Sequence, residues 1–181
     1  CGCVAVAIRL RHVVRGVPPS SGPQGVAEGP SGCVSGNRIF LVCARAASHQ
    51  DKRSGGDPTA RDIGDRKTIR EYCNFNLGTA QDAGTTRIGS DNWLMNNVHI
   101  AHDCVVGDQT IMAGYAGLAG HVHLGDWSIV GALIGVHQFV RRGPHSMSGF
   151  QSHVSQHVPP FMMVGRNPLT VRGFNAAGLP V

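Results

Sequence analysis

An apolar residue returns at almost every sixth position between Ile88 and Val154, and the residue four places after each one is nearly always small or branched. A helix repeats every 3.6 residues and a plain strand every two, whereas a coil of short strands joined by similar corners repeats every six. Arg142 and Ser148 interrupt the apolar series. The pattern therefore predicts an all-β hexapeptide solenoid. The apolar positions are Ile88, Leu94, Ile100, Val106, Met112, Leu118, Leu124, Val130, Val136 and Val154.

The same period gives a ruler for placing polar residues. Three hexapeptides make one triangular coil, so positions 18 apart stack about 4.8 Å from each other. His121 comes one position more than a full coil after His102, and His137 comes two positions less than a full coil after His121. The ruler predicts that these three histidines and His99 gather near one corner. Clustered imidazoles there would bind a metal, hold an anion or act as a general base near neutral pH.

The chain divides into three zones. Residues 1–47 contain the run PPSSGP at 18–23 and no six-residue register, so we expect a divergent or poorly ordered segment. Residues 48–164 form the repeat domain, with a polar insertion near 78–87 that we expect to leave the coil as a loop, often on the binding face. Residues 165–181 read as an irregular exit. Because a solenoid end needs a cap, and the chain starts at Cys1, we expect a fragment.

Composition narrows the choice of function. The chain is 41% hydrophobic and 15% charged, and no apolar run approaches the roughly 18 residues of a membrane span, so we expect no integral membrane segment. Its net charge is +5, but the basic residues are scattered and aromatics are few, which argues against nucleic acid as a partner. Six cysteines without paired CxxC spacing indicate a reduced, cytoplasmic protein.

Several short sequence motifs resemble those of a known family. They are NNVHIAHDC at 96–104, LAGHV at 118–122, VHQF at 136–139 and VPP at 158–160. In this order and spacing, over about residues 48–179, the chain resembles the acyl carrier protein-dependent UDP-N-acetylglucosamine O-acyltransferases, which begin lipid A synthesis. The resemblance implies a left-handed parallel β-helix, a hand that periodicity alone does not predict. It also implies a helical C-terminal domain, which we expect to be missing from this chain.

The resemblance assigns roles to particular residues. His102 would be the general base that accepts the proton of the sugar 3-hydroxyl, Asp103 would orient the site, and the Gly120 N–H would face the developing oxyanion. The residues expected to position the sugar nucleotide and the acyl thioester are Asp51, Arg53, His99, Asp103, His121, His137, Gln138 and Asn175.

The implied partners are acyl carrier protein, UDP-N-acetylglucosamine and two further copies of the chain in a homotrimer, and no metal or organic cofactor is expected. Solenoidal carbonic anhydrases have a further His five places after their second ligand, where this chain has Arg142, which argues against zinc. Arg141 and Arg142 either dock an acidic carrier protein or belong to a merely solvated face. Phe150 stands where the family often has a glycine lining the acyl slot, so we expect a shorter acyl chain.

Two other functions remain open from the sequence. One is acyl transfer to an amine by an enzyme of the same architecture. The other is an inactive solenoid that only trimerises or binds ligand, because both ends of the repeat look incomplete.

Overall fold

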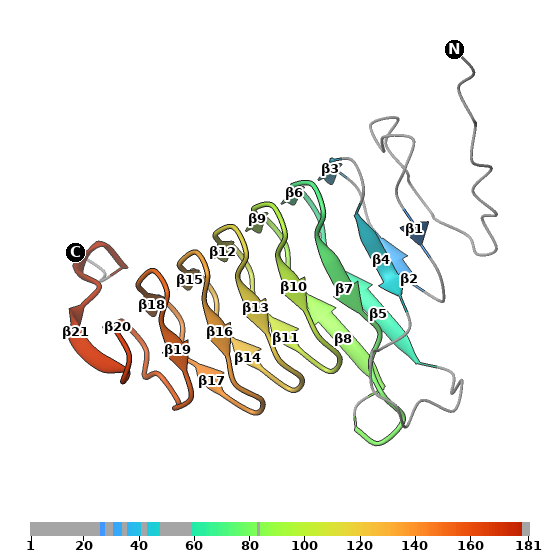
Figure 1. The fold of residues 1–181 in the computed structure, drawn as a ribbon. Helices are drawn as coiled ribbons and strands as arrows, with labels where there is room; N and C mark the ends of the chain where they lie inside the picture. The colour runs from blue at the N-terminus through green and yellow to red at the C-terminus, as the bar shows by residue number, and fades with distance from the viewer. Residues whose placement is uncertain are drawn as a thin grey trace, which may run out of the picture.

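The computed structural model describes residues 26–27, 31–33, 36–40, 43–47, 59–82 and 84–178. These residues form an elongated three-sided coil whose successive turns advance along one axis (Figure 1). Within this part of the chain, no helix is long and apolar enough to cross a membrane. The all-β expectation is confirmed, because a 3-10 helix, η1 (Ala176–Gly178), is the one helical element among the described residues.

Each side of the coil is one sheet. The first sheet contains, in spatial order, β1 (Val26–Ala27), β4 (Ala44–Ala47), β7 (Asn74–Asn76), β10 (His99–Ile100), β13 (Gly117–Leu118), β16 (Gly135–Val136) and β19 (His153–Val154). The second contains β2 (Ser31–Cys33), β5 (Ala60–Ile63), β8 (Thr85–Ile88), β11 (Val105–Val106), β14 (His123–Leu124) and β17 (Arg141–Arg142). The third contains β3 (Arg38–Ile39), β6 (Thr68–Ile69), β9 (Trp93–Leu94), β12 (Ile111–Met112), β15 (Ile129–Val130), β18 (Met147–Ser148), β20 (Met162–Gly165) and β21 (Thr170–Phe174).

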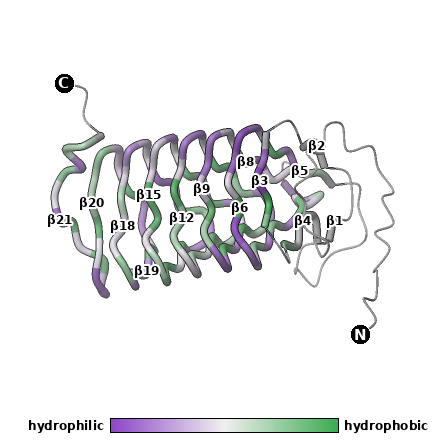
Figure 2. Tube along the Cα trace, turned by 90° about the horizontal axis from the view of Figure 1, so that it is seen from above, coloured by the Kyte–Doolittle hydropathy of each residue, from purple (hydrophilic) through white to green (hydrophobic). Residues whose placement is uncertain are grey.

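The predicted ruler is confirmed by the parallel register. Ile100 pairs with Leu118, Leu118 with Val136 and Val136 with Val154, so one inward column runs from coil to coil. The main-chain N–H of Ala101 donates to the carbonyl of Leu118 at 3.1 Å. Figure 2 shows hydrophobic colour returning in coil after coil. Alternate residues of each short strand therefore face a continuous apolar interior.

The corners depend on left-handed backbone. Asn97, Asp103, Gln109, Tyr115 and His121 follow one another at every sixth position, and their φ angles lie between 55° and 63°. This conformation costs a non-glycine residue about 1–2 kcal/mol. Coil-to-coil hydrogen bonds offset that cost, as when the His121 N–H donates to the His102 carbonyl at 3.1 Å. The side chains at these corners consequently stack in columns, as the strands do.

Buried thiols occupy two of the small inward positions, as the sequence predicts. Cys73 and Cys104 are both 0% exposed, and each Sγ donates to a main-chain carbonyl at 3.1 Å. Burial raises the pKa of Cys104 to about 12. Thiols in this environment are structural and unreactive.

The ends of the described chain also belong to the sheets. Within residues 1–47, where the sequence shows no register, β3 pairs with β6 so that Ile39 stacks on Ile69. At the other end β21 runs antiparallel to β20, so the exit segment contains a strand rather than only irregular chain. The zone boundaries at residues 47 and 164 stay predictions.

Arg142 corrects one expectation. It occupies the inward position of β17, where Leu124 stacks on it, and it is 2% exposed. Its guanidinium donates to Ser148 Oγ at 3.0 Å, to the Ile129 carbonyl at 3.1 Å and to Ser146 Oγ at 3.3 Å. Burial lowers its pKa to about 10. The prediction of a docking charge is wrong for Arg142, because the same register that buries Leu124 buries it, whereas Arg141 is exposed.

We expect the combined substitution Arg142→Ile, Ser146→Val and Ser148→Val to raise the free energy of unfolding by about 1–4 kcal/mol, because replacing a buried polar cluster by packed apolar residues removes the desolvation penalty. Ser148→Val alone should lower it by about 1–3 kcal/mol, because Arg142 then lacks one acceptor. Chemical denaturation of the three proteins measures both changes. A triple variant less stable than the parent would contradict the expectation.

Candidate active site

His102 and Asp103 form a hydrogen-bonded pair at the corner between β10 and β11. His102 Nδ1 lies 3.0 Å from Asp103 Oδ2, and the two side chains are 18% and 0% exposed. A carboxylate beside Nδ1 favours the tautomer that carries its proton there. Nε2 of His102 is then the ring nitrogen that carries no proton in the neutral form.

The buried Asp103 carboxylate is held by the polar insertion. The Thr79 N–H donates to its two oxygens at 3.0 and 3.1 Å, and Thr79 Oγ1 donates to Oδ2 at 2.6 Å. The Asp103 N–H in turn donates to Thr86 Oγ1 at 2.8 Å. These donors stabilise a charge that burial would otherwise penalise. Asp103 is therefore fixed as an acceptor for the His102 ring.

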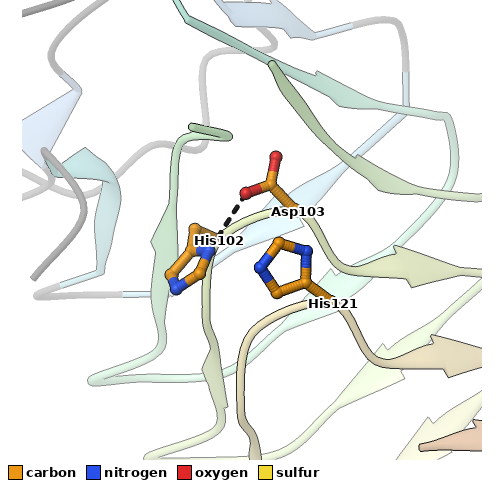
Figure 3. Close-up of side chains that lie close together, drawn as sticks. All are labelled: His102, Asp103 and His121. Carbon is orange, nitrogen blue, oxygen red and sulfur yellow. Dashed lines mark hydrogen bonds and ion pairs between the residues drawn. The ribbon is translucent and has the colours of Figure 1, made fainter. Parts of the chain in front are cut away.

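His121 joins this pair because it stands one coil above Asp103. The rings of His102 and His121 meet edge to face, with centroids 5.0 Å apart and an interplanar angle of 86°. Phe139, one coil further along, stacks on His121 with ring centroids 4.5 Å apart and an interplanar angle of 11°. Figure 3 shows His102, Asp103 and His121 converging on one corner.

Gly120 lies directly against the base. A Cβ built on it would sit 2.5 Å from His102 Cε1 and 2.7 Å from Nε2. Gly120 is buried and stands one coil above His102. Its backbone therefore lies against the His102 ring, and no larger residue fits without moving that ring.

Of the other two histidines, His99 lies on β10 and His137 directly follows β16. His137 is exposed, and its ring centroid lies 6.5 Å from that of His153. His99 is half-buried in β10, where it pairs with Gly117, and burial lowers its pKa. The structure thus brings His102 and His121 together as the ruler predicts, and the gathering of His99 and His137 at the same corner stays a prediction.

The remaining predicted residues are Gln138, Phe150, Asn175, Asp51 and Arg53. Gln138 and Phe150 are exposed. Asn175 Nδ2 donates to the His145 carbonyl at 2.9 Å, so its amide ties the exit segment to the coil. Asp51 and Arg53 lie outside the described residues.

His102, Asp103 and His121 are also the group within the described chain best able to hold a metal, since one ligand atom of each lies within 4.8 Å of the others. The Asp103 oxygens, however, already accept from Thr79 and face His102. His121 Nδ1 is engaged by Asp82 Oδ2 at 2.6 Å. This arrangement suits a positioned base better than a metal site.

Sequence reasoning missed four residues of the site, which are Thr79, Asp82, Thr86 and Phe139. Two of them follow from the ruler, because Phe139 lies one full coil beyond His121 and Thr86 lies one full coil before Cys104. Thr79 and Asp82 belong to the insertion, which has no register, so only its prediction as a loop on the binding face pointed toward them.

Comparison with known proteins identifies the family. Residues 85–120 match the family described as bacterial transferase hexapeptide (six repeats). The acyl-[acyl-carrier-protein]--UDP-N-acetylglucosamine O-acyltransferase of Verminephrobacter eiseniae is 58% identical over 154 residues, covering 85% of this chain and 59% of that protein. The crystal structure of the UDP-N-acetylglucosamine O-acyltransferase of Moraxella catarrhalis RH4 is 36% identical with a TM-score of 0.82, covering 90% of this chain and 71% of that one. This chain belongs to the UDP-N-acetylglucosamine O-acyltransferase family.

Membership of the UDP-N-acetylglucosamine O-acyltransferase family confirms the fold class, a left-handed parallel β-helix of hexapeptide repeats. The family member of Thiobacillus denitrificans is 52% identical over 143 residues, covering 79% of this chain and 55% of that protein. The chain thus spans a little more than half the length of the curated O-acyltransferases that it matches.

We expect Gly120→Ala to displace His102 and break its contact with Asp103, because the added methyl would overlap the ring. A crystal structure of the variant measures this, with the Nδ1 to Oδ2 separation expected to exceed about 3.5 Å. Gly135→Ala is the matched control, since its Cβ meets no atom within 4 Å. A His102 ring that keeps its position in the Gly120 variant would contradict the expectation.

Proposed function

We propose that the protein transfers an (R)-3-hydroxyacyl group from acyl carrier protein to the 3-hydroxyl of UDP-N-acetylglucosamine, the first step of lipid A biosynthesis. The observation that carries the proposal is the His102–Asp103 pair, at 3.0 Å, beside Gly120 in a chain of this family. The relative from Verminephrobacter eiseniae is named for that donor and acceptor. The site residues below are assigned on the same basis.

In the proposed reaction, His102 acts on the sugar hydroxyl and Gly120 on the thioester oxygen. As the sugar 3-oxygen attacks the thioester carbonyl carbon, its proton passes to His102 Nε2, because a hydroxyl is a weak nucleophile until a base accepts its proton. The Gly120 N–H stabilises the oxyanion, a contribution of about 3 kcal/mol for one such donor. The carbon–sulfur bond then breaks, and the carrier-protein sulfur takes the proton back from His102. The thioester already activates the acyl group, so no metal or organic cofactor is needed.

Other residues of the proposal bind rather than react. His99, His121, His137 and Gln138 position the acyl group and the sugar nucleotide, and Asn175 contacts the nucleotide. The lowered pKa of His99 keeps its imidazole neutral at physiological pH, which suits hydrogen bonding to an uncharged sugar. Asp51 and Arg53 are assigned to the substrate and its phosphates by their positions in the sequence alone.

Acyl carrier protein and two further copies of the chain complete the proposal. The exposed Arg141 and the net charge of +5 favour an acidic partner. Three flat sheets per chain favour side-by-side packing into a homotrimer, with sites between neighbouring subunits. We assign the reaction to the cytoplasm, whose reducing poise keeps thiols such as Cys73 and Cys104 unoxidised.

We expect His102→Ala to lower kcat/KM by about 10²–10⁴-fold, because the substitution removes the general base. The assay uses UDP-N-acetylglucosamine with a series of (R)-3-hydroxyacyl carrier proteins. His145→Gln is the matched control, since the ring of His145 stacks on Trp127 and Phe161 at another corner of the coil. Equal loss in both variants would overturn the role of His102. The same assay is run with a nucleotide sugar that carries a free amine, and a folded, trimeric parent that acylates neither acceptor would favour an inactive solenoid. Turnover of the amino sugar alone would favour N-acyl transfer.

We expect Phe150→Gly to shift the donor preference toward longer acyl chains. Phe150 is 62% exposed at a corner, where its benzyl group would occupy volume that extra methylenes need. The ratio of kcat/KM for a longer donor to that for the preferred donor should rise by about tenfold or more. Competition between two carrier-protein donors of different chain length measures this ratio directly, and an unchanged ratio would refute the expectation.

A further inference from the structure

We propose that Asp82 is a positioning residue that orients His121, so that the polar insertion holds a second histidine–carboxylate pair beside His102–Asp103. The inference rests on the proposed function. Asp82 Oδ2 lies 2.6 Å from His121 Nδ1, although the two residues are 39 apart in sequence. The imidazole is 18% exposed and the carboxylate 52% exposed, so the pair lies at the protein surface rather than in the core.

One short loop controls both pairs. Thr79 donates twice through its N–H and once through its hydroxyl to Asp103. Asp82, three places later, reaches His121. The Asp82 N–H and the Gly84 N–H both donate to the Thr79 carbonyl, at 3.2 and 3.1 Å, which closes the loop on itself. The carboxylate that orients each imidazole is therefore placed by the same Thr79.

The ends of the loop are anchored to the solenoid. The Gly78 N–H donates to the Ala60 carbonyl at 3.1 Å, and the Ala60 N–H donates to the Gly84 carbonyl at 2.8 Å. Gly78 packs so closely on the backbone of Gly84 and Thr85 that a Cβ has no room. Because β5 fixes both ends, the loop presents Asp82 at a defined place above the corner.

The other contacts of His121 fix the plane of its imidazole ring but do not determine which ring nitrogen carries the proton. Phe139 stacks on one face, and His102 meets the ring edge to face. Neither contact distinguishes Nδ1 from Nε2. A carboxylate at Nδ1 selects the Nδ1–H form of the ring. The Nε2 lone pair is then free to accept a hydrogen bond from a hydroxyl or N–H group of the acyl chain or the sugar nucleotide. Without Asp82, the ring would sample both tautomers beside the base.

A double-mutant cycle tests this role in the purified protein. Asp82→Ala should lower kcat/KM by about 10–100-fold, by analogy with the loss caused when the hydrogen-bond partner of a metal-ligating histidine is removed. In a His121→Ala background, the same substitution should change kcat/KM by less than about threefold, because Asp82 then has nothing to orient. Losses that simply add would overturn the proposal, since they would mean that Asp82 acts on substrate or on folding directly.

Two further variants separate positioning from structure. Asp82→Asn keeps an acceptor oxygen, so it should recover at least part of the activity that Asp82→Ala loses, whereas equal loss in both would count against the hydrogen bond. Asp62→Asn is the control that removes the same charge elsewhere. Asp62 is an exposed carboxylate on β5, outside the insertion, so this substitution should leave kcat/KM unchanged.

A measurement without turnover distinguishes failure of this inference from failure of the proposed function. Long-range ¹⁵N–¹H NMR of the histidine rings should show His121 as the Nδ1–H tautomer in the parent protein and as a mixture in Asp82→Ala. An unchanged His121 signal in the variant would overturn the pair. A parent that transfers no acyl group, yet shows the tautomer change, would overturn the proposed function while supporting the pair.

Discussion

The structure depends on one constraint, the coil-to-coil register between parallel strands. Each coil hydrogen-bonds to the next along all three sheets, as when the Gly117 N–H donates to the Ile134 carbonyl at 2.8 Å and the Ile129 N–H to the Ser146 carbonyl at 2.8 Å. These bonds hold the corner residues in a left-handed conformation that isolated chain would avoid. A residue's neighbours are consequently those one full coil before and after it. Core columns, corner stacks and the candidate site are three results of this rule.

The candidate site shows how a repeat produces a unique place. Asp103, His121 and Phe139 share one corner column, and His102 and Gly120 share the column beside it. The other regular corners have the same left-handed backbone, so the chemistry here comes from side chains and from the insertion. Asn74 pairs with His99 across a coil that the insertion between β7 and β8 has lengthened. That loop brings Thr79 and Asp82 to a corner whose histidines would otherwise lack oriented partners.

Arg142 marks the limit of what the register controls. The position is inward whatever residue occupies it, since the strand alternation and the Leu124 pairing are backbone properties. Three acceptors offset the desolvation penalty of the buried Arg142 guanidinium. They are the hydroxyls of Ser146 and Ser148, which also occupy inward positions, and the Ile129 carbonyl. A polar cluster inside the apolar interior is thus tolerated because acceptors less than one full coil away along the chain accept hydrogen bonds from the buried guanidinium.

Periodicity alone determined that this chain is a hexapeptide solenoid, that equivalent positions of successive coils stack, and that Cys73 and Cys104 face inward, because these are consequences of a local repeat. The family sequence motifs identified His102, Asp103 and Gly120 as candidate catalytic residues. The repeat also predicted that His102 and His121 lie together, whereas only the tertiary structure decided that they meet edge to face and that His137 lies beside His153. The tertiary structure also decided the partners of both imidazoles. Thr79 and Asp82 lie in an insertion without period, and its path is set by bonds to Ala60 on a different sheet.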